Sequence, residues 1–246
     1  MSVAEKPQAL LDYLRLAADY LAKCGSDSPR LDAELLLAHV LKLDRVALYV
    51  NHDRPLVKEE VDAFRELLRQ RGRGVPMAYI LGEKPFLTTS LAVTPAVLIP
   101  RPETELLVEA VVEEMGAFSG DELFVADVGT GSGAIAIGVA LGEQRARVVA
   151  LDVSAEAAEV AATNGERHRL GERVRVVVGD LLTPLLSEAD GASLKGRLDV
   201  VVSNPPYIAS GEWATLPKDV REFEPRLALD GGADGLDVYV NRVWDK

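Results

Sequence analysis

Four short apolar runs rich in β-branched residues recur between residues 123 and 203, separated by stretches with helical periodicity. Each run is apolar on both faces, which is typical of a strand in a parallel sheet that helices cover on both sides. This alternation predicts a doubly wound, Rossmann-like α/β domain, in which ligands bind at the carboxyl ends of the strands. The predicted strands are LFVADV (123–128), RVVALD (147–152), VRVVVGD (174–180) and LDVVVS (198–203).

The first 75 residues predict a separate, small all-α domain. A second helix should begin after Ser28, a capping residue followed by Pro29 in the first turn. A third helical pattern covers residues 58–74. The first helix is marked by apolar residues at helical spacing, namely Leu10, Leu14, Ala17 and Leu21.

From residue 76 to residue 100 the helical periodicity gives way to short β-rich runs, which predict a β-hairpin linker. Short β-rich runs are separated there by Gly82, Pro85 and Pro95. A helix should follow, with Pro102 and Glu103 at its start. Its expected apolar stripe consists of Leu106, Leu107, Ala110 and Val111.

The charge distribution narrows the possible partners. The first 75 residues carry equal numbers of basic and acidic side chains, so the whole formal net charge of −12 lies in the remainder. Duplex-binding proteins usually show a basic face, and this composition therefore argues against nucleic acid. It suits a cationic small molecule or a basic protein, although an acidic surface also simply aids solubility.

Several structural classes are not indicated by the sequence. No apolar run approaches the roughly 20 residues that span a bilayer, and the first residues do not resemble a signal peptide. We therefore expect a cytoplasmic protein without a membrane partner. The single cysteine indicates neither an internal disulfide nor a thiolate zinc site, and no metal is expected.

Glycines and carboxylates follow the first three predicted strands. Gly129, Gly131 and Gly133 allow a tight turn and a close approach of the backbone to a ligand, but with the following alanine they also fit a dinucleotide-binding pattern. Asp152 ends the second strand, where a carboxylate can accept both hydroxyls of a ribose. Asp180 ends the third and could accept from an adenine amino group. Either aspartate could instead be a helix cap.

The fourth predicted strand is followed by Asn-Pro-Pro-Tyr, which helps to decide between a dinucleotide and another nucleoside-containing ligand. Asn204 offers a side-chain carbonyl and Pro205 a backbone carbonyl in a stiff segment. Two such acceptors suit the planar NH2 of an amide or an aromatic amine, and holding both N–H bonds exposes the nitrogen lone pair. Tyr207 could lie flat against that group. A hydride carrier has no use for this clamp, whereas the methyl donor S-adenosylmethionine does, with Asp127 and the glycine turn for its amino-acid tail.

These residues together resemble the HemK/PrmC family of protein-(glutamine-N5) methyltransferases. The similar segments, in family order, are SPRLDAELLLAHVL, GVPMAYILGEKPF, VLIPRPETE, DVGTGSGAIAI, SNPPYI and FEPRLALDGGADGLDVY. The resemblance implies a helical substrate-recognition domain (1–75), a hairpin linker (76–100) and a seven-stranded class I methyltransferase domain (101–246). It also implies S-adenosylmethionine as donor and the Gly-Gly-Gln glutamine of peptide chain release factors as target.

The resemblance also implies roles for individual residues. The substrate glutamine amide would be held by Asn204, Pro205, Pro206 and Tyr207, with Arg101 and Glu103 shaping the pocket. The donor would be bound by Asp127, Gly129, Thr130, Gly131, Asp152, Asp180, Leu181 and Asn204. Asp127, Gly129 and Gly131 would line its methionine portion, Asp152 would bind the ribose and Asp180 the adenine side.

Two stretches depart from the family pattern. The hairpin lacks an expected Gly-Leu, which leaves its turn geometry open. After GLDVY the sequence continues as VNRVWDK, without the apolar strands that should complete the sheet. Either the C-terminal strands are missing, which would leave the sheet with an unpaired edge, or the sheet closes differently. We expect lower stability and solubility than in a relative with a complete sheet, and a monomer.

Other functions fit the same clamp. An exocyclic adenine amine could replace the amide, which would make the chain an N6-adenine methyltransferase of nucleic acid. The target could also be a glutamine of a ribosomal protein. Finally, a chain with an incomplete sheet could bind the donor or a release factor and methylate nothing.

Overall fold

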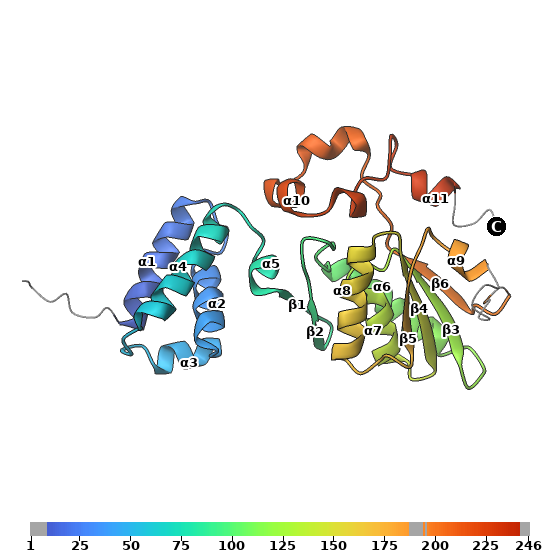
Figure 1. Cartoon of the computed structure of the whole chain (residues 1–246), viewed down its shortest axis with the longest axis horizontal. Helices are drawn as coiled ribbons and strands as arrows, with labels where there is room; N and C mark the ends of the chain where they lie inside the picture. Colours follow the sequence, from blue (N-terminus) through green and yellow to red (C-terminus); the bar gives the residue numbers. More distant parts are fainter. Residues whose placement is uncertain (1–8, 187–193, 195, 242–246) are drawn as a thin grey trace, which may run out of the picture. The chain divides into compact units, whose positions relative to one another are not determined.

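The structure is a computed structural model that describes residues 9–186, 194 and 196–241. The chain divides into two compact units, of which the first ends at Leu81 and the second begins at Gly82 (Figure 1). Among the described residues, no helix is long and apolar enough to cross a membrane.

The first unit is helical, as predicted. All four residues of the predicted first apolar stripe are buried. Ser28 precedes the second helix, but its side chain makes no capping bond; Ser26 donates to Asp32 Oδ2 instead, at 2.7 Å. The helices are α1 (Leu10–Lys23), α2 (Pro29–Leu41), α3 (Arg45–Val50), α4 (Lys58–Gly72) and α5 (Met77–Leu81).

The prediction was wrong for residues 77–81, which were expected within the β-rich segment but form helix α5. The carbonyl of Pro76 accepts hydrogen bonds from the backbone N–H groups of Tyr79 and Ile80, which starts a helical turn. Ile80 is buried in the same apolar core as α1, α2 and α4. A proline at the start and an apolar anchor therefore outweigh the β propensity of this short stretch.

The second unit contains the predicted parallel sheet, with strand order β5-β4-β3-β6. In the residues that the structure describes, the parallel sheet has four strands, whereas the resemblance implies seven. They are β3 (Leu123–Val128), β4 (Ala146–Asp152), β5 (Val174–Val178) and β6 (Val200–Ser203), so all four predicted strands are confirmed.

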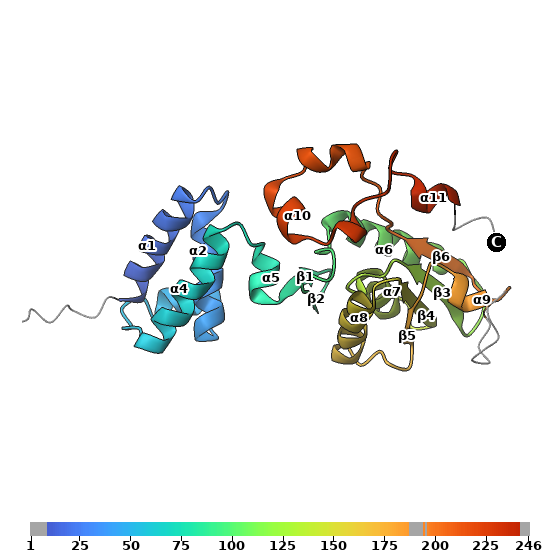
Figure 2. The same ribbon diagram turned by 45° about the horizontal axis from the view of Figure 1, so that its top comes forward.

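Helices cover both faces of this sheet. Alternate residues of a strand enter different cores: Val125 packs with residues of α7 (Ala134–Gly142), whereas Ala126 packs with Leu185 of α9 (Thr183–Leu186). Figures 1 and 2 both place the sheet between α9 and the pair formed by α7 and α8 (Ala155–Arg167). This arrangement explains why the strands are apolar on both faces.

The predicted hairpin is confirmed as β1 (Glu83–Phe86) paired antiparallel with β2 (Thr89–Ala92). Its turn places Leu87 in the left-handed region (φ 49°), and the Leu87 N–H donates to Glu105 Oε1 at 3.0 Å. Asn164 of α8 fastens the other end, because its amide nitrogen donates to the carbonyl oxygens of Ala92 and Ser132. The hairpin is thereby tied to the loop after β3.

Helix α6 (Pro102–Met115) forms where it was predicted, but its buried face is rotated. Leu106, expected in the apolar stripe, is 65% exposed, and the buried positions are Thr104, Val108 and Met115. The predicted Leu107 and Val111 are only partly buried. Apolar residues stand on more than one side of this helix, so periodicity alone selects the wrong face.

The chain beyond β6 folds back toward the end of that strand. The Ile208 N–H donates to the carbonyl of Leu229 at 3.0 Å, and the Gly231 N–H donates to the carbonyl of Ile208 at 2.8 Å. This returning segment runs past the strand ends in both ribbon views (Figure 2). Its elements are η1 (Ser210–Thr215), α10 (Lys218–Phe223), η2 (Arg226–Ala228) and α11 (Asp237–Asn241).

Candidate active site

A cavity of about 400 Å³ lies at the carboxyl ends of the parallel strands. This is the place that the fold predicts for a ligand, and the volume is that of a small-molecule site. Most of the predicted site residues are on its wall, namely Gly129, Thr130, Gly131, Asp152, Asp180, Leu181, Asn204, Pro205 and Pro206.

The glycine loop between β3 and α7 forms part of the cavity wall. Gly129 and Gly131 have φ values of 73° and 55°, and a Cβ on either would meet no atom within 4 Å. Gly133 differs, because a Cβ there would lie 3.3 Å from the backbone of Ala161 in α8. The first two glycines therefore leave room for a ligand, and the third allows close packing of two segments.

Asp152 at the end of β4 holds the glycine loop in place. Its Oδ2 accepts from the backbone N–H of Gly131 at 2.8 Å, and its Oδ1 accepts from the backbone N–H of Ser154 at 3.0 Å. The carboxylate also lines the cavity. Because each carboxylate oxygen can accept more than one hydrogen bond, Asp152 can still receive ligand hydroxyls. Asp180 and Leu181 border the same cavity after β5.

Asp127 lies beneath the loop and is not on the cavity wall. It is fully buried, and its Oδ2 accepts from the Thr130 hydroxyl at 2.6 Å and the Ala136 N–H at 3.0 Å. Oδ1 has no hydrogen-bond partner among the described residues. Burial raises the pKa of Asp127 to about 6, the charge of Asp152 adds to the rise, and the two hydrogen bonds oppose it.

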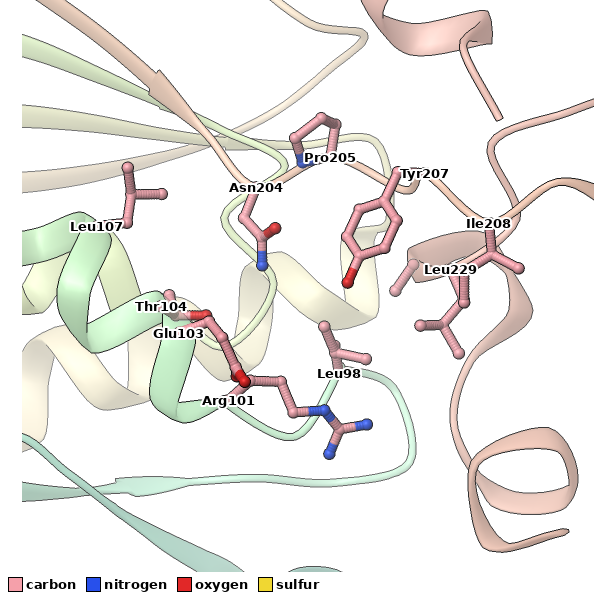
Figure 3. A pocket seen from close by; sticks show the side chains of 11 residues that line it. Leu98, Arg101, Glu103, Thr104, Leu107, Asn204, Pro205, Tyr207, Ile208 and Leu229 are labelled. Atoms are coloured by element: carbon pink, nitrogen blue, oxygen red, sulfur yellow. The ribbon is translucent and has the colours of Figure 1, made fainter. Parts of the chain in front are cut away.

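A second, smaller hollow of about 130 Å³ adjoins the Asn-Pro-Pro-Tyr segment. Figure 3 shows the amide of Asn204 and the ring of Tyr207 directed toward the start of α6, where Arg101 and Glu103 lie. Tyr207 is 63% exposed, so one side of its ring is available to a ligand. The hollow and the larger cavity share the wall residues Leu98, Thr104, Asn204, Pro205 and Ala228.

The returning C-terminal segment supports the Asn-Pro-Pro-Tyr segment, backbone against backbone. A Cβ on Gly231 would lie 2.7 Å from the carbonyl oxygen of Pro206, and a Cβ on Gly235 would lie 2.4 Å from that of Tyr207. Neither contact tolerates a side chain. On the other side, the Ser203 hydroxyl donates to the carbonyl of Val128 at 2.7 Å. These contacts fix the end of β6.

Sequence reasoning missed several residues of the site. Leu98, Thr104 and Ala228 line both hollows, and their only signal was their place in the segments VLIPRPETE and FEPRLALDGG. Glu224 was also missed: its carboxylate pairs with Nη2 of Arg101 at 2.5 Å and is 2% exposed. The only signal for Glu224 was its place in the FEPRLALDGG segment, to which no site role was given.

Comparison with known proteins identifies the family. The chain is 47% identical over 228 residues to the release factor glutamine methyltransferase of Chlorobaculum tepidum, covering 92% of this chain and 76% of the relative. The chain belongs to the release factor glutamine methyltransferase family. Relatives with the same name from Rhodopirellula baltica (42% identical, covering 98% of this chain and 80% of the relative) and Geobacter sulfurreducens (43%, covering 96% and 79%) agree.

Two family descriptions match separate parts of the chain. Residues 12–82 match "PrmC N-terminal domain", and residues 102–220 match "Methyltransferase small domain". The resemblance to the HemK/PrmC family is thus confirmed, and with it the class I methyltransferase fold and S-adenosylmethionine as the methyl donor.

The larger cavity fits this donor chemically. A Cβ on Gly129 or Gly131 would meet open space, so a ligand can approach the backbone there. Asp152 and Asp180 place carboxyl groups on the same wall, and such groups can accept hydrogen bonds from hydroxyl and amino groups. Apolar residues, Leu181 among them, form much of the remaining wall and suit an aromatic base.

Proposed function

We propose that this chain transfers a methyl group from S-adenosylmethionine to the side-chain amide nitrogen, N5, of the glutamine in the Gly-Gly-Gln motif of peptide chain release factors. One observation carries the proposal: Asn204 and Pro205 belong to the walls of both hollows. A substrate amide held by these two residues in the smaller hollow therefore borders the larger cavity. The relatives named release factor glutamine methyltransferase support the choice of target.

The Asn-Pro-Pro-Tyr segment prepares the amide nitrogen for reaction. The side-chain carbonyl of Asn204 and the backbone carbonyl of Pro205 accept the two N–H bonds, so the delocalised lone pair becomes available on the opposite side. Tyr207 packs its exposed ring against the planar amide, and Pro206 keeps the segment stiff. When bound, S-adenosylmethionine supplies an electrophilic methyl group on its sulfonium.

The donor is held by the residues that line the larger cavity. Gly129, Thr130 and Gly131 border the methionine portion and Asp152 accepts from the ribose hydroxyls. The adenine side belongs to Asp180 and Leu181, and Asn204 reaches the donor from β6. Asp127 acts indirectly, because its carboxylate fixes the Thr130 hydroxyl below the loop.

We also propose the division of labour along the chain that the sequence suggests. Residues 1–75 recognise the substrate, residues 76–100 are a hairpin linker, and residues 101–246 carry the chemistry. The match of residues 12–82 to the PrmC N-terminal domain supports a distinct role for the helical part. The enzyme acts as a monomer in the cytoplasm, where release factors work, and needs no nucleic acid partner.

The test is transfer of labelled methyl from S-adenosylmethionine to a purified release factor. A second release factor, in which only the Gly-Gly-Gln glutamine is replaced, is the matched control. Label on the first and not on the second is expected. Label on a ribosomal protein or on an adenine-containing oligonucleotide, with none on the release factor, would overturn the proposal. Donor binding without any transfer would instead identify a binding protein.

A further inference from the structure

Glu224 is a buried carboxylate whose two oxygens both bind the loop before α6. Its Oε1 accepts from Nη2 of Arg101 at 2.5 Å, and its Oε2 accepts from the backbone N–H of Ile99 at 3.2 Å. The side chain is 2% exposed and stands directly after α10. A carboxylate held so far from water needs such partners, and these two lie more than 120 residues earlier in the chain.

Arg101 lies at the rim of the smaller hollow, together with Glu103 and Tyr207 (Figure 3). Its side chain is 35% exposed, so it reaches solvent as well as Glu224. A guanidinium carries five N–H donors in a fixed fork, and among the described residues only Glu224 accepts from it. The other N–H groups are available to a ligand at the rim.

The charges at the rim select the kind of acceptor that Arg101 can meet. Glu224 neutralises the guanidinium, and the exposed Glu103 adds a negative charge to the same hollow. An anionic ligand such as a phosphate would gain little there, whereas a neutral carbonyl oxygen can still accept a well-directed hydrogen bond. Main-chain carbonyls of a peptide have this chemistry.

We propose that Glu224 is a positioning residue for the protein substrate: it holds Arg101 so that the guanidinium donates to main-chain carbonyl oxygens of the peptide flanking the methylated glutamine. The inference rests on the proposed function and adds to it a means of recognising peptide backbone. This role also gives a reason for the hydrogen bonds from Glu224 to Ile99 and Arg101, which hold the loop before α6 against both hollows.

Glu224→Gln tests the role of the carboxylate. The glutamine can keep its carbonyl on the Ile99 N–H, but its NH2 group then faces Arg101 donor to donor, so the guanidinium is released. Because a hydrogen bond to a charged group contributes about 1.5–3 kcal/mol, we expect KM for the release factor to rise about 10- to 100-fold. KM for S-adenosylmethionine should stay near the wild-type value. A merely structural loss would raise both KM values and lower the melting temperature.

A double-mutant cycle decides whether Glu224 acts through Arg101. Arg101→Ala should raise KM for the release factor as much as Glu224→Gln does, and the double variant should be no worse than Arg101→Ala alone. Arg101→Lys keeps the charge but lacks the fork, so it should also raise that KM. The control is Glu122→Gln, which breaks an exposed ion pair with Arg147 at the start of β3 and should change neither KM.

The outcomes separate this inference from the proposed function. Wild-type enzyme that fails to methylate any release factor refutes the function itself. With an active wild type, an unchanged release-factor KM in Glu224→Gln, or additive effects in the double variant, overturns the positioning role. If Glu224→Gln does not fold, the two Arg101 variants remain decisive, because an unchanged KM in both removes Arg101 from substrate binding.

Discussion

Asp152 at the end of β4 accepts a hydrogen bond from the backbone N–H of Gly131, 2.8 Å away in the loop after β3. Asp152 ends β4 and Gly131 lies in the loop after the neighbouring strand β3, so the bond joins the segments at two adjacent strand ends, both on the wall of the larger cavity. The same carboxylate that is expected to meet the ribose therefore also sets the shape of the loop that meets the methionine portion. We therefore expect donor binding and loop geometry to be coupled through this one side chain.

Gly129→Ala should weaken donor binding more than its cost in stability explains. A Cβ at this positive φ costs roughly 1–2 kcal/mol in strain and would also project from the cavity wall. Gly25→Ala is the matched control, since Gly25 has a φ of 86° and equally open space but lies in the helical unit. Calorimetry should show loss of donor affinity only for the Gly129 variant. Equal donor affinity in both variants would remove the glycine loop from the donor site.

Asn204→Ala should abolish most turnover while leaving the donor bound. The variant removes one of two acceptors that hold the substrate amide, and loss of a preorganised polar contact costs about 10²-fold or more in kcat. Single-turnover methylation and donor titration measure the two effects separately. Thr163→Ala is a control that should leave both unchanged, because this exposed residue of α8 donates its hydroxyl to the carbonyl of Glu159 in the same helix. Turnover at the wild-type rate in Asn204→Ala would contradict the clamp.

The strands and the site were predictable from the sequence for one physical reason: parallel strands buried on both faces leave an uninterrupted apolar signal, and their ends lie at one edge of the sheet. Asn204 and Asp152 could be placed together on that basis. The ion pair between Arg101 and Glu224 could not be predicted, because the two residues are distant in sequence and the local sequence around one contains no sign of the other. The burial of Asp127 was equally hidden, since a strand-end carboxylate looks the same whether it lies on the wall or beneath it.

Gly231→Ala should slow methylation through the backbone of the Asn-Pro-Pro-Tyr segment. The added Cβ would lie 2.7 Å from the carbonyl oxygens of both Pro206 and Gly235, so the contact between the Asn-Pro-Pro-Tyr segment and the returning segment must shift. A displacement of about 1 Å at a catalytic group can cost 10²-fold in rate. Gly211→Ala in η1 is the control, because its Cβ would meet nothing within 4 Å. If kcat of the Gly231 variant equals that of the control, the glycine does not support the active segment.

Asp127→Asn should change the pH dependence of stability in a defined direction. The folded-state pKa of Asp127 is raised from 3.8 to about 6, so the folded protein binds this proton more tightly than the unfolded chain does. Its contribution to the free energy of unfolding is therefore greatest below pH 4 and falls by about 3 kcal/mol as the pH rises through 6. Urea titrations from pH 4 to 7 should show wild-type stability falling relative to Asp127→Asn and then levelling off. Asp62→Asn is the control of opposite sign, because Lys58 lowers the pKa of Asp62. A constant difference between wild type and Asp127→Asn across this range would show that burial does not hold the proton on Asp127.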